Sequence, residues 1–354
     1  MTETDAEGGA SRDAMGIAAR QLEKSFGDTE VIRSLDVAVE PGQIVGLIGP
    51  SGCGKTTTVR LLLGLLTPTA GEATIGGRPS VELTSAERSR IGYLPQTPAL
   101  FPELSLVENL NFHASMYGLP LRRAAAVGRV LEWVELDEHR TKRVSDASGG
   151  MQRRLALAAA FVHDPDVVFL DEPTAGIDPI LRDKLWQRFR AARDDGTTVL
   201  VTTQYVGEAG ECDLVGLLSD GQLLLFDTPA QLRHAAFGGE VVDVVLLEPP
   251  SDEDVDAIGR TACVVGEVVR RDARGLRVVV EDADEAVPAL RDALEARQLV
   301  VDDICEHVVD YDEAFVQVVE RHRRGRHDEP DGGLDAAPTD TDDGKEPAGA
   351  GAER

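Results

Sequence analysis

The segment Gly49-Pro50-Ser51-Gly52-Cys53-Gly54-Lys55-Thr56-Thr57 decides the fold of this chain. It fits the pattern G-x-x-x-x-G-K-[ST], the P-loop, whose glycines let successive backbone N–H groups point at one bound phosphate. The apolar run before it, residues 44–48, predicts a buried strand, and the apolar spacing of residues 56–66 predicts a helix. A chance match is the alternative, but this flanking strand and helix favour a true phosphate-binding loop. Lys55 adds positive charge there, and the Thr56 hydroxyl is placed to bind magnesium.

Length and charge limit what the rest of the chain can be. At 354 residues the chain is long enough for two domains with tails. The formal net charge of −27 argues against a nucleic-acid partner, because nucleic acids bind basic surfaces. Acidic residues are spread along the whole chain, which favours adaptation to high salt, where ions screen the self-repulsion of the protein. An acidic protein of an ordinary cytosol, with an acidic tail, is the alternative.

Neither a membrane span nor a disulfide framework is expected. The longest unbroken apolar run, residues 155–162, is too short for a bilayer, which needs about 18 residues. The N-terminal residues lack a signal-peptide pattern, so we expect a cytosolic protein or one held at a membrane by a partner. The four cysteines show no C-x-x-C spacing and are expected to be free thiols. A nearby helix N-terminus can depress the pKa of Cys53, but we favour a small residue that the loop simply tolerates, and not a nucleophile.

Residue patterns divide the chain into a tail, a large unit, a small unit and a second tail. Residues 1–14 and 324–354 are rich in Gly, Asp and Glu without periodicity, and we expect both to be disordered, the second as an acidic tail. The large unit covers residues 15–237. Its predicted elements are strands across 17–40 with a turn at 26–28, a helical insertion at 104–143 in a subdomain of about 103–150, and a strand at 167–170. They continue with a helix at 181–192, which Asp178-Pro179 starts, and a strand at 197–203.

Residues 238–323 predict a small α+β domain. The predicted strands cover 240–247, 263–269, 276–281 and 299–309, and the predicted helices 251–259, 284–297 and 313–323. Their order up to the last strand is β-α-β-β-α-β, the ferredoxin-like pattern, with Ser251 as a suitable helix N-cap. Such a domain can bind an effector, but we favour a dimerisation or packing role.

Two acidic residues and a Ser-Gly-Gly element narrow the kind of P-loop protein. Asp171 ends an apolar strand and is placed to hold a hydrated magnesium ion, and Glu172 beside it is placed to polarise a water against the terminal phosphate. Ser148-Gly149-Gly150 begins a helix and offers a second phosphate-binding surface; an ordinary serine N-cap is the alternative. Because the chain already has a P-loop, the second surface is best explained as serving the nucleotide of a partner.

With these residues in view, the chain resembles the ATP-binding subunits of ABC transporters over about residues 14–237. The resemblance implies an α/β P-loop NTPase fold of the ABC type with a helical subdomain, ATP hydrolysis as the activity, and ATP and Mg²⁺ as cofactors. It implies that Phe26 stacks on adenine, that the P-loop binds the phosphates, and that Gln96 reads metal and nucleotide and faces a membrane subunit. The family's remaining motifs match Ser148, Gly149, Gly150, Met151 and Gln152 (the signature, which binds the partner's ATP), Asp171 with Thr56 and Gln96 (the metal site), Glu172 (the base) and Asp178 (the D-loop).

Three positions depart from the family pattern. Ala147 and Met151 stand where the signature usually has Leu and Gln. Gln204 occupies the position of the switch histidine, and its amide can donate a hydrogen bond to the terminal phosphate without carrying a proton. The segments 202–205 and 310–315 resemble the drug-resistance, daunorubicin-type subgroup, so we expect turnover to survive, with Lys55, Glu172 and Gln204 as the catalytic residues.

The resemblance implies the ATPase of an exporter for drugs or hydrophobic compounds, held at the cytoplasmic side of the membrane by a separate membrane subunit. Two copies would sandwich two ATP–Mg²⁺, with Lys55 from one chain facing Ser148 and Gly150 of the other. One alternative is a soluble ABC-type ATPase without a transporter, which usually carries two nucleotide units or a long coiled coil, and this chain has neither. The other is a non-enzymatic or weakly hydrolysing regulatory subunit. Gln204 and the altered signature favour it, and the intact Lys55, Asp171 and Glu172 count against it.

Overall fold

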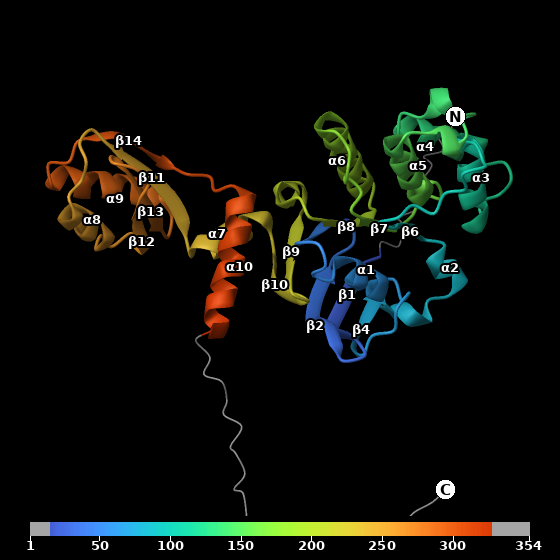
Figure 1. The fold of residues 1–354 in the computed structure, drawn as a ribbon, viewed down its shortest axis with the longest axis horizontal. Coiled ribbons are helices and arrows are strands. Elements are labelled where there is room, and N and C mark those ends of the chain that lie inside the picture. Colours follow the sequence, from blue (N-terminus) through green and yellow to red (C-terminus); the bar gives the residue numbers. More distant parts are fainter. Residues whose placement is uncertain (1–14, 328–354) are drawn as a thin grey trace, which may run out of the picture.

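The computed structural model describes residues 15–327. Figure 1 shows a large unit built around two sheets, a small unit built around one sheet, and helix α10 between them. The predicted tail at residues 1–14 lies outside the described residues, as does the part of the second tail from residue 328. Helix α10 (Tyr311–His327) includes the first residues of that predicted tail.

The central sheet of the large unit has six strands in the order β10-β9-β3-β8-β7-β6. Five strands run parallel, and β10 pairs antiparallel with β9. Every residue of β3, β7 and β8 is buried because the sheet is covered on both faces, which explains their apolar sequences. The strands are β3 (Ile44–Ile48), β6 (Ile91–Leu94), β7 (Val167–Asp171), β8 (Thr198–Thr203), β9 (Leu214–Ser219) and β10 (Gln222–Asp227).

An antiparallel sheet in the order β2-β1-β4-β5 lies beside the central sheet, with α1 (Lys55–Leu62) packed in the apolar core between them. Helix α1 ends before the predicted limit of residue 66, because Gly64 adopts the left-handed conformation (φ 67°) that terminates helices. The strands are β1 (Ile17–Phe26), β2 (Thr29–Val39), β4 (Ala70–Ile75) and β5 (Arg78–Pro79), and the short helices η1 (Ser80–Glu82) and α2 (Ser85–Arg88) follow.

Three helices form a separate bundle at one end of the large unit (Figure 1). They are α3 (Leu106–Met116), α4 (Ala124–Trp133) and α5 (Gly149–Phe161). The predicted helical insertion at 104–143 therefore consists of two helices, separated where Gly118 takes φ 79° and Pro120 follows. The 3-10 turns η2 (Asp137–His139) and η3 (Val144–Asp146) connect α4 to α5. Helix α5 belongs to this bundle and also packs against the central sheet.

The other face of the central sheet is covered by α6 (Pro179–Asp194), η4 (Val206–Glu211) and α7 (Pro229–Phe237). Helix α6 begins where the sequence predicted, with Asp178 as N-cap and Pro179 at the first position. The sequence patterns did not predict β4, β5, β6, β9, β10, α2 or α7. Asp220-Gly221 between two apolar runs is the hairpin signal that identifies β9 and β10.

The small unit confirms the predicted ferredoxin-like pattern. Its four strands form an antiparallel sheet in the order β12-β13-β11-β14, with α8 and α9 packed on one face. Ser251 caps α8 as predicted, and its hydroxyl accepts a hydrogen bond from the backbone N–H of Asp254. The elements are β11 (Glu240–Leu246), α8 (Asp252–Gly259), β12 (Val264–Arg270), β13 (Gly275–Val280), α9 (Ala283–Ala296) and β14 (Val301–Glu306).

The last helix, α10, returns to the large unit. Tyr311, Phe315 and Val318 pack against the apolar core beneath the central sheet, while Ala314 contacts a small cluster shared with α7 and β11. The Arg277 guanidinium of β13 donates to the Glu313 carboxylate at 3.0 Å, which ties α10 to the small unit as well. The helix predicted as the end of the small domain therefore joins both units.

Candidate functional site

The P-loop connects β3 to α1 at the carboxyl edge of the central sheet. Gly54 is the N-cap of α1 with φ 109°, and a Cβ there would lie 2.6 Å from the side chain of Ile32. A Cβ on Gly49 would lie 2.1 Å from the carbonyl oxygen of Leu218. Only glycine fits at these two positions, so the loop conformation is fixed by sterics as well as by its own hydrogen bonds.

Lys55 lies folded over the loop that it follows. Its side chain is almost completely buried, and Nζ donates to the carbonyl oxygens of Gly49 at 2.7 Å and Pro50 at 3.0 Å. Nζ also lies 3.9 Å from Oε1 of Glu172, so the ammonium group faces the base predicted from the sequence. A cavity of about 250 Å³ opens at this point, lined by Val31, Ser51, Gly52, Gly54, Lys55, Thr56, Thr57, Gln96 and Glu172.

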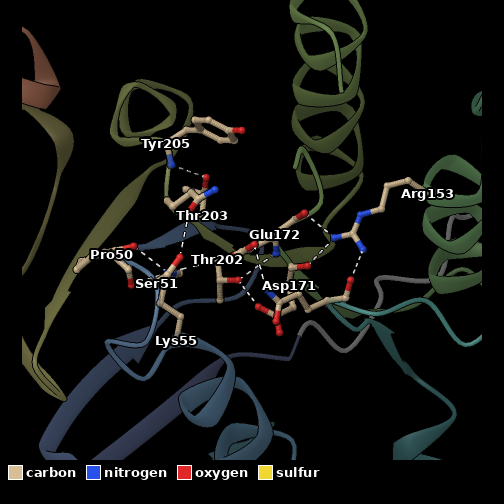
Figure 2. A network of polar contacts seen from close by, with 12 residues as sticks. Pro50, Ser51, Lys55, Arg153, Asp171, Glu172, Thr202, Thr203 and Tyr205 are labelled. Carbon is tan, nitrogen blue, oxygen red and sulfur yellow. Dashed lines mark hydrogen bonds and ion pairs between the residues drawn. The ribbon is translucent and has the colours of Figure 1, made fainter. Parts of the chain in front are cut away.

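Asp171 is fully buried at the end of β7. Its Oδ1 accepts a hydrogen bond of 2.5 Å from the Thr202 hydroxyl, and its Oδ2 has no hydrogen-bond partner among the described residues (Figure 2). A buried carboxylate oxygen left without a donor fits a hydrated cation, whose waters would donate to it. Thr56 and Gln96, the other predicted metal residues, line the adjacent cavity. Thr202 was not predicted as a site residue, because a threonine inside an apolar strand carries no local signal.

Glu172 has an unusual backbone conformation, with φ 53°, which is rare for a residue other than glycine. Its backbone N–H donates to Oγ1 of Thr202 at 3.1 Å, and Gln96 Nε2 donates to its Oε2 at 3.2 Å. The guanidinium of Arg153 binds its carbonyl oxygen (Figure 2). The structure thus brings the side chains of Gln96 and Glu172 together, and it adds Arg153, which the sequence did not single out.

Gln204 reaches the P-loop from the neighbouring strand. Parallel pairing places Ile48 opposite Thr203, so the residues that follow β3 and β8 lie side by side. The Ser51 hydroxyl donates to Oε1 of Gln204 at 3.2 Å, and the backbone N–H of Gly49 donates to the carbonyl oxygen of Thr203 at 3.3 Å. The side chain at the switch position is therefore in direct contact with the phosphate-binding loop.

The signature segment lies outside this cavity. Ser148 caps α5, its hydroxyl accepting a hydrogen bond from the N–H of Met151 at 3.3 Å. Apart from their chain neighbours and the helix's own backbone, no atom of the described residues lies within 4 Å of a Cβ built on Gly149 or Gly150. The Met151 side chain is buried in the helical bundle, and the Gln152 amide donates back to the carbonyl oxygens of Val144 and Ala147 at 3.1 Å each. The exposed part of the signature is thus Ser148 and the two glycines.

Three other predicted residues occupy distinct places. Phe26, at the end of β1, is half exposed, and the ammonium of Lys24 lies 5.0 Å from its ring centroid. Burial raises the pKa of the Cys53 thiol despite the nearby charge of Lys55. The helix N-terminus therefore does not give this thiol a depressed pKa. Asp178 caps α6, its carboxylate accepting from the N–H of Leu181 at 3.0 Å.

Known proteins resemble this chain in sequence and in fold. The sequence profile described as ABC transporter matches residues 32–175. The daunorubicin resistance ATP-binding protein DrrA3 of Streptomyces coeruleorubidus is 38% identical over 304 residues, which cover 85% of this chain and 95% of that protein. The Nod factor export ATP-binding protein I of Cupriavidus pinatubonensis is 40% identical over 230 residues, 64% of this chain and 70% of that protein.

Among solved structures, the ATP-binding subunit of an ABC transporter matches with a TM-score of 0.58 and 27% identity, over 62% of this chain and 92% of that chain. A nucleotide-free ATP-binding cassette matches with a TM-score of 0.55 and 19% identity, over 62% of this chain and 94% of that chain, which bears on the fold alone.

Proposed function

The chain belongs to the ABC transporter family as an ATP-hydrolysing subunit related to exporter ATPases, and from this premise we propose that two copies close around two ATP–Mg²⁺ to drive a separate membrane subunit. The observation that carries the proposal is the separation of the two phosphate-binding surfaces. The P-loop, Gln96 and Glu172 share one cavity, whereas Gly149 and Gly150 lie elsewhere with open space before them. One chain therefore holds half of each of two sites.

We assign the roles in the site from the contacts of each side chain. Mg²⁺ would be held by the Thr56 hydroxyl, the Gln96 side-chain oxygen and, through water, the Asp171 carboxylate, and it would neutralise phosphate charge. Lys55 exchanges its two carbonyl contacts for phosphate oxygens. Glu172 accepts a proton from the attacking water, and the amide of Gln204 donates to the terminal phosphate. Ser148 and Gly150 of the second copy, at the start of the segment that includes Met151 and Gln152, bind the same phosphate.

A surface for the membrane subunit is proposed beside Gln96. The apolar patch consists of Phe101, Phe112, Met116 and Leu121, of which Met116 is 69% and Leu121 91% exposed. The rings of Phe101 and Phe112 are 4.5 Å apart, so the loop after Gln96 and helix α3 meet at these two side chains. Clustered exposed apolar side chains mark an interaction surface. Within residues 15–327, no helix is both long and apolar enough to span a bilayer, and we place the protein at the cytoplasmic face through this partner.

The cargo class and the salt environment are proposed on separate grounds. The alignment with the daunorubicin resistance protein covers 304 residues, which is more than the 237 residues that precede the small unit, so the alignment includes part of the small unit. This similarity supports export of a drug or hydrophobic compound. The net charge of −27 supports a protein adapted to high salt. We also propose a domain division near Gly238, which ends α7 in the left-handed conformation and separates the cores of the two units.

Substitution of Glu172 by glutamine tests the dimer and the base together. The amide cannot accept the proton, so hydrolysis should fall about 10²–10⁴-fold while ATP still binds. The variant should then accumulate as an ATP-bound dimer, seen by light scattering and by nucleotide content after gel filtration. Equal activity of both proteins would contradict the assignment of Glu172, and a monomer at saturating ATP–Mg²⁺ would contradict the sandwich.

Co-purification tests the membrane partner. The full chain is produced together with the protein of about six membrane spans that we expect to be encoded beside it. Met116→Glu with Leu121→Glu should weaken the complex, because both charges would enter the apolar patch. Val265→Glu is the matched control, since Val265 is an exposed valine on β12 outside the patch. Equal loss of binding in the control, or none in the double variant, would contradict the surface.

A further inference from the structure

Arg153 is a buried cation that the proposed roles leave unexplained. It lies on α5, one turn after Gly149, and the residue is only 9% exposed. Burial lowers the pKa of its guanidinium, and the charges of Asp171 and Glu172 act in the opposite direction. A buried charge is costly unless hydrogen bonds satisfy it, so its partners are informative.

The guanidinium spans two segments that are far apart in the sequence. Nη1 donates to the carbonyl oxygens of Pro95 and Gln96 at 3.2 and 2.9 Å. Nη2 donates to those of Asp171 and Glu172 at 2.7 and 2.5 Å (Figure 2). Four carbonyl oxygens are thus held by one planar group whose donor directions are fixed. A lysine ammonium has three donors around a single point and cannot reproduce this fork.

These hydrogen bonds of Arg153 affect the position of the Glu172 carboxylate. Its backbone carries the strained φ of 53°, which persists only where the surroundings hold it, and Arg153 binds its carbonyl oxygen. The same guanidinium fixes the backbone of Gln96, whose side chain donates to Oε2 of Glu172. We propose that Arg153 is a positioning residue, which holds the segment around Gln96 against the Asp171-Glu172 segment and thereby sets the position of the Glu172 carboxylate for hydrolysis.

The position of Arg153 also connects the two halves of the dimer. Helix α5 begins at the signature, so a nucleotide of the partner bound at Ser148 acts on the helix that carries Arg153. This inference rests on the proposed role of Glu172 and on the proposed sandwich.

Three variants of the full chain test the positioning role by steady-state ATP hydrolysis and by equilibrium binding of ATP. Arg153→Met should lower kcat about 100-fold, within the range of a displaced general base, while the Kd for ATP changes less than about twofold. Arg153→Lys should recover part of the loss. Arg154→Met is the matched control and should keep kcat within about twofold. Among residues 15–327, the hydrogen bonds of the Arg154 guanidinium go only to the carbonyl oxygens of Val134 and Glu135 on the bundle. If Arg153→Met does not fold, kcat and the Kd for ATP are compared between Arg153→Lys and the native protein instead.

A double-mutant cycle with Glu172→Gln decides whether Arg153 acts through the base. In that background, Arg153→Met should lower the residual single-turnover rate by less than about threefold, because the group that it positions is already gone. A further 100-fold loss would overturn the proposal, as would a parallel loss of ATP binding in Arg153→Met or equal effects of Arg153→Met and Arg154→Met. Full activity of Glu172→Gln alone would instead refute Glu172 as the base. The activity of Glu172→Gln is therefore measured before any Arg153 variant.

Discussion

Thr202→Val replaces the hydroxyl that binds the buried Asp171 carboxylate with a methyl group of the same shape. The hydroxyl donates to Oδ1 of Asp171 at 2.5 Å and accepts from the N–H of Glu172, and the other carboxylate oxygen has no described partner. Because a hydrogen bond to a charged group contributes about 1.5–3 kcal/mol, we expect the free energy of unfolding to fall by about 2–3 kcal/mol. For a unit of this size, that corresponds to about 4–12 °C in Tm.

The metal affinity should fall as well. Thr202 orients the carboxylate that we assign to the hydrated Mg²⁺, and loss of such a supporting hydrogen bond typically costs about 10–100-fold in affinity or activity. Urea unfolding followed by tryptophan fluorescence measures the first effect, since the only two tryptophans, Trp133 and Trp186, both lie in the large unit. The Mg²⁺ concentration that half-saturates ATP hydrolysis measures the second.

Two controls separate the site from the strand. Thr202→Ser keeps the hydroxyl and should retain most of the metal affinity. Thr198→Val removes a buried hydroxyl at the other end of β8, which donates to the carbonyl oxygen of Met15 at 2.8 Å, so it should lower stability without changing the Mg²⁺ requirement. An unchanged Mg²⁺ requirement in Thr202→Val, with stability altered by less than about 0.5 kcal/mol, would refute the reasoning.

Three further predictions concern the switch position, salt and acid. Gln204→His should change the ATP hydrolysis rate by less than about tenfold, because an amide and an imidazole both donate to a phosphate; a gain of orders of magnitude would show that the native site is impaired. Unfolding monitored against KCl should show loss of structure below molar salt, and full stability in dilute buffer would contradict the high-salt adaptation. Burial lowers the pKa of His163 from 6.5 to about 4. The unfolded chain therefore binds a proton that the folded chain does not, and stability should fall by on the order of 3 kcal/mol as pH drops from 6.5 to 4. In His163→Gln, the urea midpoint of unfolding should not show this loss of stability between pH 6.5 and 4.

Local sequence patterns were sufficient for elements whose structure depends on near neighbours. The P-loop strand ends at Ile48 as predicted, and Ser251 and Asp178 cap the helices that they were expected to begin. The β-α-β-β-α-β order also emerged from the alternation of apolar residues. Prediction failed where the local signal was weak, as in β4, whose first three residues are all exposed so that alternation is limited to its last three.

The sequence by itself determined the phosphate-binding loop, the pair Asp171 and Glu172, and the glycines after Ser148, because each depends on residue types at fixed spacing along the chain. The tertiary structure alone decided what joins them. Arg153 reaches four carbonyl oxygens on two distant segments, and Thr202 binds Asp171 across neighbouring strands. Neither contact has a pattern along the chain, since each arises from the parallel register of the sheet and the packing of α5 against it. The tertiary structure also places the exposed glycines after Ser148 outside the cavity over the P-loop.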